Sequence, residues 1–173
     1  LSIIVPVYNE SRTLAQALRA AEASDIGLMR KELVVVDDCS RDGSRKIVEE
    51  YQTENKSTVY TTRLHPTNRG KGAALRTGFA ACSGDFIIVQ DADLEYDPRD
   101  YPRLLQPLVE DKADVVYGSR FISNEPTRVL YFHHYAANRF LTTFSNIFTG
   151  LNLSDMETGY KAFSRAALET ILP

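Results

Sequence analysis

Phe86-Ile87-Ile88-Val89-Gln90-Asp91-Ala92-Asp93 joins a run of four apolar residues to two closely spaced carboxylates. The apolar run indicates a strand that is buried on both faces. Two like charges as close as Asp91 and Asp93 are unfavourable unless a cation lies between them. Mg²⁺ and Mn²⁺ bind carboxylate oxygens and fill their remaining positions with phosphate oxygens. The stretch therefore predicts a metal site for a phosphorylated ligand at the end of a strand, with a solvated acidic turn as the alternative.

The composition is that of an ordinary globular domain. The chain has 173 residues, 43% of them hydrophobic and 25% charged, which is enough for one domain with a core of useful size. A formal net charge of -3 gives no reason to expect a nucleic-acid partner. The two cysteines, Cys39 and Cys82, have no metal-like spacing and suit a reducing compartment.

Both ends of the chain suggest a piece of a longer protein. The sequence opens at Leu1 on strand-like residues without a start Met, and it ends at Pro173 just after a helical pattern. We expect one domain over residues 1–173 that is truncated at both ends. No apolar run reaches the roughly 20 residues that span a bilayer, and the missing ends could hold a membrane segment.

Strands and helices alternate along the chain. Strand-like runs lie at residues 1–5, ending at Pro6, and at 33–36, 58–63, 86–89 and 114–117. Helical patterns lie at 10–21, at 44–51 with Ser44 as cap, and at 73–81, 101–110 and 127–148, the last being one long helix or two broken near Asn138. This order predicts an α/β three-layer sandwich, a mostly parallel sheet with helices on both faces.

Polar residues follow each of the five predicted strands. In such sheets, ligands bind beyond the carboxyl ends of the strands. The residues at these five positions are Pro6, Tyr8, Asn9 and Glu10; Asp37 and Asp38; Asn68 to Gly72; Asp91 and Asp93; and Gly118 to Arg120. We expect them to share one site.

Gly70-Lys71-Gly72 precedes a predicted helix. Glycines at a helix start let backbone N–H groups approach an anion, and the helix dipole favours negative charge there. The spacing matches neither the dinucleotide-binding fingerprint nor the phosphate loop. A plain helix-start turn is an equally good interpretation.

Four motifs in this order resemble family 2 glycosyltransferases. They are Ser2-Ile3-Ile4-Val5-Pro6-Val7-Tyr8-Asn9-Glu10, Glu32-Leu33-Val34-Val35-Val36-Asp37-Asp38-Cys39-Ser40, Asn68-Arg69-Gly70-Lys71-Gly72 and Asp91-Ala92-Asp93. Asp155-Met156-Glu157-Thr158-Gly159-Tyr160-Lys161 is similar to a late motif of the polyprenyl-phosphate branch, which includes dolichol-phosphate mannose synthases and bacterial glucosyl relatives. The resemblance implies the nucleotide-diphospho-sugar transferase (A-type) fold over nearly the whole chain.

The resemblance also implies a UDP- or GDP-linked sugar donor and a base pocket. Pro6, Tyr8 and Glu10 would line the pocket for the base and ribose. Asp38 would accept a hydrogen bond from the base, and Asp37 would support the turn.

The donor diphosphate would be held with a Mg²⁺ or Mn²⁺ ion. By resemblance, Lys71 would lie near the nucleotide, Asp91 would contact the ribose or the water shell of the metal, and Asp93 would bind the metal. A divalent ion neutralises charge that develops on a nucleoside diphosphate leaving group. Family members of this kind invert the anomeric carbon by one in-line displacement.

Two further residues point to the acceptor. Asp155 begins the late motif and would orient the acceptor, bind the metal or act as catalytic base; the alternative is a helix cap before a helix at 161–168. Arg120 suits bidentate contact with an acceptor phosphate, and Arg128 and Arg139 would assist. Tyr135 stands where we expect an arginine in dolichol-phosphate mannose synthases, which favours other sugars.

The segment 127–154 contains no acidic residue and places Phe140, Phe144 and Phe148 on one helix face. Such a stripe predicts core packing in the first instance. A membrane surface, a lipid tail or a missing C-terminal region are the other candidates to cover it.

Together these patterns predict a metal-dependent, inverting glycosyltransferase that moves a sugar to a polyprenyl (dolichyl or undecaprenyl) phosphate. We expect it at the cytoplasmic face of the cell membrane, without nucleic acid and with a homo-oligomer possible. The alternatives are a transferase with a glycan acceptor, a non-catalytic nucleotide-sugar binding module and a nucleotidyltransferase.

Overall fold

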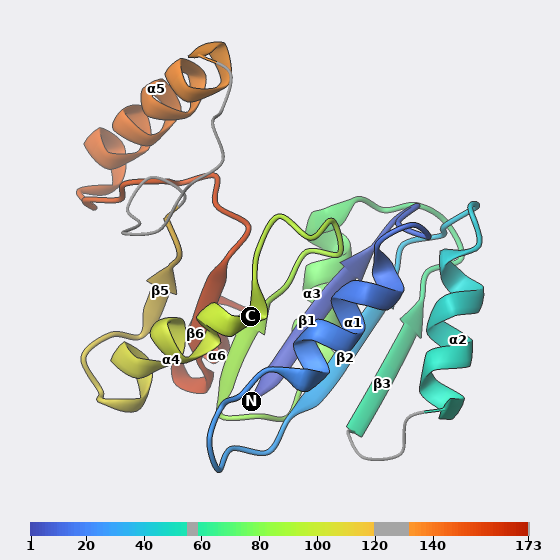
Figure 1. Cartoon of the computed structure of the whole chain (residues 1–173). Helices are drawn as coiled ribbons and strands as arrows, with labels where there is room; N and C mark the ends of the chain where they lie inside the picture. The colour runs from blue at the N-terminus through green and yellow to red at the C-terminus, as the bar shows by residue number, and fades with distance from the viewer. Residues whose placement is uncertain (55–58, 120–131, 173) are drawn as a thin grey trace.

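The computed structural model describes residues 1–54, 59–119 and 132–172. Within these ranges, six strands form one sheet in the order β3-β2-β1-β4-β6-β5 (Figure 1). The strands are β1 (Ser2–Val7), β2 (Glu32–Asp37), β3 (Val59–Leu64), β4 (Phe86–Val89), β5 (Val115–Tyr117) and β6 (Lys161–Ser164). β1 pairs in parallel with β2 and β4, and β2 with β3, so the predicted mostly parallel sheet is confirmed.

Helices cover both faces of this sheet. They are α1 (Leu14–Ala23), α2 (Ser44–Glu54), α3 (Lys71–Ala81), α4 (Tyr101–Val109), α5 (Phe132–Thr149) and α6 (Arg165–Ile171), with a short 3₁₀ helix at Pro98–Asp100. Alternate residues of β1 point to opposite faces of the sheet. Ile3 and Val5 pack with α1, α2 and α4 on one face, and Ile4 packs with α3 and α6 on the other. The predicted three layers follow from this two-sided burial.

β1 continues through Pro6, contrary to the expectation that the strand ends there. Ile4 O accepts a hydrogen bond from Gln90 N, so the backbone N–H and C=O groups of the even-numbered residues of β1 point toward β4. The ladder with β4 stops at Ile4. At Pro6, β1 therefore has no partner strand on the side where a backbone N–H would donate. A strand tolerates proline at such a position, because no ladder hydrogen bond is lost.

β6 was not predicted, and the helix expected at 161–168 is wrong. Lys161–Ser164 forms an antiparallel strand between β4 and β5, with Ile88 opposite Ala162. The helix α6 starts only at Arg165, where the Ser164 hydroxyl accepts a hydrogen bond from Ala167 N. The late motif at 155–160 thus leads into the centre of the sheet.

α5 is one helix, unbroken at Asn138, and in Figure 1 it projects beyond β5. Its predicted core stripe is wrong: Phe140, Phe144 and Phe148 are 68%, 54% and 73% exposed. The opposite face carries Asn138, Thr142 and Asn146, which bond to residues of the 153–157 loop. The helix therefore turns its polar stripe inward and its aromatic stripe outward. Across the described ranges, no helix is both long and apolar enough to cross a membrane.

Candidate active site

The carboxyl ends of β1, β2 and β4 open onto a cavity of about 340 Å³ that the start of α3 also lines. Predicted site residues from all four places line it: Pro6, Tyr8, Glu10, Asp38, Lys71, Asp91 and Asp93. The structure therefore brings these residues, from separate strand ends, together at one cavity. Asp37 and Asp155 lie outside the lining, and Arg120 and Arg128 lie outside the described residues.

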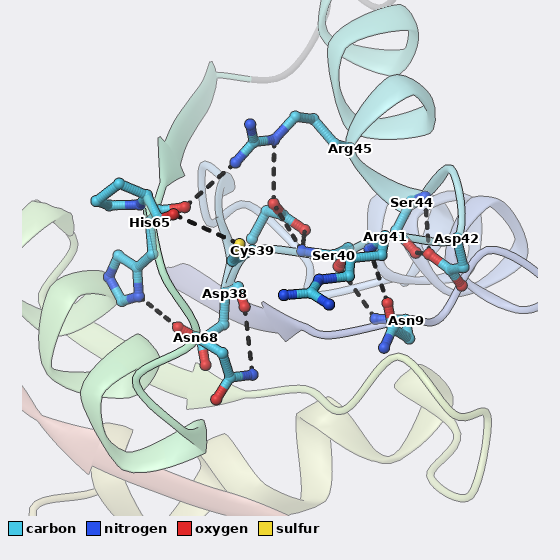
Figure 2. A network of polar contacts seen from close by, with 12 residues as sticks. Asn9, Asp38, Cys39, Ser40, Arg41, Asp42, Ser44, Arg45, His65 and Asn68 are labelled. Carbon is cyan, nitrogen blue, oxygen red and sulfur yellow. Dashed lines mark hydrogen bonds and ion pairs between the residues drawn. The ribbon is translucent and has the colours of Figure 1, made fainter.

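The turn after β2 is held together by Asp37, which is fully buried. Its carboxylate accepts hydrogen bonds from Arg45 Nε at 3.2 Å and from Ser40 N at 3.3 Å (Figure 2). Arg45 belongs to α2 and also donates to the His65 carbonyl. Asp37 therefore joins the β2 turn to α2 and to the end of β3 without reaching the cavity itself.

The loops after β1 and β2 are bonded to each other (Figure 2). Asn9 Oδ1 accepts from Arg41 N, and Asn9 N donates to Ser40 Oγ. Ser44 is the first residue of α2 rather than its cap, and its hydroxyl accepts from Glu10 N and donates to Asp42. Tyr8 and Glu10 are thereby fixed relative to the β2 turn.

Burial opposes ionisation of Asp42, but hydrogen bonds from Ser44 and Ser11 outweigh it and hold the pKa of this carboxyl far below its usual value. The bonds are donated by the Ser44 hydroxyl and by the Ser44 and Ser11 N–H groups. A permanent negative charge therefore stands at the start of α2, where the helix dipole favours it.

Asp38 is buried and is the centre of a second network (Figure 2). Its carboxylate accepts from Arg69 N at 2.9 Å, from Gly70 N at 2.7 Å and from His65 Nδ1 at 2.6 Å. An ionised carboxylate only accepts, so Nδ1 of His65 carries the proton, while Nε2 lies 2.9 Å from Thr77 Oγ1. Burial raises the pKa of Asp38, but these hydrogen bonds outweigh it and the net pKa is lowered.

Asp38 therefore fixes the loop that starts α3, in addition to lining the cavity. Gly70, at φ +84°, is the residue before the helix. Sequence reasoning missed His65. Its position directly after β3, at the same rim as the other polar residues, was the available signal.

Asp91 and Asp93 lie on the loop after β4, which a buried glutamine anchors. Gln90 Oε1 accepts hydrogen bonds from Tyr101 and Tyr160, both at 2.9 Å. Gln90 Nε2 donates to the Asp91 carbonyl at 3.0 Å. The buried amide thus fastens the carboxylate loop to α4 and to the late motif.

The late motif packs directly on this loop. Tyr96 OH accepts from Gly159 N at 2.7 Å, and the Tyr96 ring stacks on Tyr160 with centroids 4.5 Å apart. Lys71 Nζ reaches the Asp91 carboxylate across the cavity, 2.6 Å from Oδ1. Residues 91–96 and 158–160 therefore form one contact region at the cavity rim.

Asp155 is buried, and the helix-cap interpretation of this residue is wrong. Asn138 Nδ2 of α5 donates to Asp155 Oδ1 at 2.9 Å, and α6 begins ten residues later. Asn138 in turn accepts from the Thr142 hydroxyl. Asp155 thus connects α5 to the late motif, a link that sequence reasoning missed.

The donor set of Asp91 and Asp93 fits a hard divalent cation, because both are carboxylate residues and both line the same cavity. Among the described residues, no group of three or more His, Cys, Asp and Glu side chains is placed to hold a metal. A metal held by two carboxylates would keep further coordination positions open for phosphate oxygens. Lys71 and the amino end of α3 add positive charge beside it.

Comparison with known proteins agrees with this geometry. The family model for glycosyl transferase family 2 matches residues 2–172. A low-salt glycan biosynthesis hexosyltransferase, Agl6 of Haloferax volcanii, is 33% identical over 99% of this chain and 40% of its own length. An undecaprenyl-phosphate 4-deoxy-4-formamido-L-arabinose transferase of Pseudomonas savastanoi is 40% identical over 67% of this chain and 34% of its own length. The chain thus spans less than half of either relative.

Solved structures share the fold. The mannosyltransferase PcManGT of Pyrobaculum calidifontis, in complex with GDP-Man and Mn²⁺, superposes with a TM-score of 0.71 at 23% identity, over 98% of this chain and 46% of that one. S. aureus TarS 1-349 in complex with UDP-GlcNAc gives a TM-score of 0.56 at 28% identity, over 66% of this chain and 32% of that one. With the family model matching almost every residue, the chain belongs to glycosyl transferase family 2.

Proposed function

We propose that residues 1–173 form a single catalytic domain that transfers a sugar from a UDP- or GDP-sugar to a polyprenyl phosphate, with inversion and with Mg²⁺ or Mn²⁺. The observation that carries this proposal is the shared cavity, which joins the Asp91 and Asp93 carboxylates, Lys71 and the start of α3. The printed activities of the relatives, a hexosyltransferase and an undecaprenyl-phosphate sugar transferase, support the reaction class.

The donor lies in the cavity with its base and ribose against Pro6, Tyr8, Glu10 and Asp38. Tyr8 is 47% exposed and offers a ring for the base to stack on. The diphosphate lies between the start of α3 and the loop after β4. Asp91 and Asp93 hold the divalent ion, which when bound neutralises charge on the departing diphosphate. The neighbours solved with GDP-Man and Mn²⁺ or with UDP-GlcNAc support a donor of this kind.

The acceptor approaches from the side of the late motif. Its phosphate oxygen forms a bond to the anomeric carbon while the bond from that carbon to the diphosphate oxygen breaks, which inverts the centre. A phosphate monoester is largely ionised at pH 7, so Asp155 orients groups rather than removing a proton. Arg120 pairs with the acceptor phosphate.

The outward aromatic face of α5 supports attachment to the cytoplasmic surface of a membrane. Phe140, Phe144, Ile147, Phe148 and Leu151 are all more than half exposed, and a contiguous exposed apolar patch marks an interaction site. In the sequence of α5, residues 132–149, Arg139 is the single Asp, Glu, Lys or Arg residue. The helix therefore has no acidic side chain that would repel an anionic lipid surface. A second copy of the chain is the alternative occupant of this face.

A donor screen followed by a transfer assay tests the proposal. Calorimetry with UDP-glucose, UDP-N-acetylglucosamine and GDP-mannose, each with Mn²⁺, is expected to give binding for one base and none in EDTA. The full-length protein is then expected to transfer that sugar to undecaprenyl or dolichyl phosphate. Donor binding without transfer to any acceptor would identify a binding module instead. Transfer to a glycan alone would show that the acceptor is a glycan and not a polyprenyl phosphate.

A further inference from the structure

The ammonium group of Lys71 forms an ion pair with the carboxylate of Asp91. Its Nζ lies 2.6 Å from Oδ1 and 2.7 Å from Oδ2, so the ammonium bridges both oxygens. A chelated divalent ion would take the same edge of the carboxylate. The Asp91 side chain is 14% exposed and that of Lys71 55% exposed, so the partner that is free to move is the lysine.

Asp91 is also held in place by two groups other than Lys71. A Cβ at Gly159 would lie 2.4 Å from Asp91 Oδ2, so the Gly159 backbone packs directly against the carboxylate. Gln90 Nε2 fixes the Asp91 carbonyl at 3.0 Å. The carboxylate is therefore approached from the cavity, where Lys71 stands.

Two cations on one carboxylate repel each other strongly in a partly desolvated site. Lys71 is the first residue of α3, and its flexible four-carbon stem lets the ammonium move while the helix stays in place. A nucleoside diphosphate bound in the same cavity would offer the displaced ammonium a new anion, with which a lysine forms charge-assisted hydrogen bonds.

We propose that Lys71 and the divalent ion compete for Asp91, and that the donor diphosphate resolves the competition by binding the displaced lysine. This rests on the function proposed above. Metal alone binds weakly, because it must displace Lys71 into water. Metal and nucleotide together bind well, because each cation then has its own anion. Lys71 is thus a positioning residue that couples the two binding events.

The test measures Mn²⁺ binding directly, without turnover. The full chain is titrated with Mn²⁺, and free Mn²⁺ is followed by electron paramagnetic resonance. Lys71→Met is expected to bind Mn²⁺ alone about tenfold more tightly than wild type, within the usual range of coupling between sites. The same variant is expected to bind UDP or GDP in saturating Mn²⁺ about tenfold more weakly. A residue with only a structural role would not shift the two affinities in opposite directions.

Arg76→Met is the matched control. Arg76 is an exposed cation on the same helix that does not line the cavity, so the variant removes the same charge without releasing Asp91. It is expected to shift both affinities less than about twofold, since exposed charges at a distance are screened. Lys71→Gln replaces Lys71→Met should the latter unfold, with the same expected signs.

The outcomes are separable. Unchanged or weaker Mn²⁺ affinity in Lys71→Met, or an equal gain in Arg76→Met, would overturn the competition while leaving the proposed function intact. Wild-type protein that binds neither UDP nor GDP with Mn²⁺ would instead overturn the proposed function.

Discussion

Gly159 approaches Asp91 so closely that a Cβ at position 159 would lie 2.4 Å from Asp91 Oδ2. The two residues are far apart in the chain, one on the loop after β4 and the other on the segment that leads into β6. Tyr96 reinforces the contact by accepting a hydrogen bond from Gly159 N. The donor-side carboxylate and the late motif are therefore packed as one region, and a change on one side is expected to be felt on the other.

Gly159→Ala is expected to push Asp91 and Tyr96 aside and to weaken Mn²⁺-dependent nucleotide binding roughly tenfold, with overpacking costing about 1–3 kcal/mol of stability. Calorimetry and urea unfolding give the two numbers. Gly72→Ala is the control, because its Cβ would meet no atom within 4 Å, and it is expected to leave stability unchanged or slightly raised. Equal nucleotide affinity in Gly159→Ala and wild type would count against the coupling.

Asp93→Ala is expected to abolish metal-dependent nucleotide binding, because the cavity loses one of its two carboxylate ligands. Calorimetry with UDP or GDP in Mn²⁺ and in EDTA measures the effect. Glu49→Ala, on the exposed surface of α2, removes the same charge away from the cavity and is expected to bind as wild type does. Affinity that persists in Asp93→Ala would show that the metal does not use this residue.

Asp38→Asn is expected to destabilise the protein by about 2 kcal/mol at pH 7, because the amide cannot accept from His65, Arg69 and Gly70 together. The folded-state pKa of Asp38 is lowered. Its stabilising contribution is therefore full above the unfolded pKa of about 3.9 and is lost as the pH falls below it.

Urea unfolding at pH 7 and near pH 3 tests this sign. The stability gap between wild type and Asp38→Asn is expected to shrink at the lower pH, while Glu49→Gln shows no gap at either. A gap that widens in acid would mean that Asp38 is not ionised in the folded protein.

Asn138→Ala leaves the buried Asp155 without its donor from α5. We expect a loss of about 1–3 kcal/mol and, in the full-length protein, a lower kcat with unchanged donor affinity. Asn146→Ala is the matched control, because Asn146 lies two turns further along the same face and bonds to the Leu153 backbone instead. Equal kcat in the two variants would show that Asp155 has no role at the acceptor site.

Phe144→Ser is expected to weaken binding to vesicles of anionic lipid roughly thirtyfold, since burying one phenylalanine contributes about 2 kcal/mol. Co-sedimentation of the full chain with the vesicles measures it. Leu28→Ser removes a fully exposed apolar side chain elsewhere and is expected to have no effect. A change in oligomeric state in Phe144→Ser, with no change in vesicle binding, would assign the face to a second copy of the chain.

The layered fold could be predicted from local sequence patterns. Leu14, Ala17, Leu18 and Ala21 recur with helical spacing, and all four are buried on α1. The continuous apolar runs that became β2 and β4 are covered on both sides, as their composition predicts. The strand-end positions of Asp38, Asp91 and Asp93 then followed from the parallel order of the sheet.

Long-range pairing was not readable. Lys161–Ser164 is only four residues long, and its partners in β4 lie more than 70 positions earlier, so nothing local distinguishes it from the start of a helix. The contacts of Asp91 with Lys71 and Gly159 likewise depend on tertiary structure. The orientation of α5 had a local signal that went unused: Asn138, Thr142 and Asn146 repeat at the same spacing as the phenylalanines, on the opposite face.

The place of β6 between β4 and β5 constrains the order of assembly during translation. The sheet cannot be completed until the ribosome has released residue 164, because β6 is synthesised after β4 and β5 and fills the gap between them. Until then, β4 presents an unpaired edge to the cell, and such edges recruit other chains. A nascent chain halted before residue 161 is therefore expected to need chaperone protection that the finished domain does not.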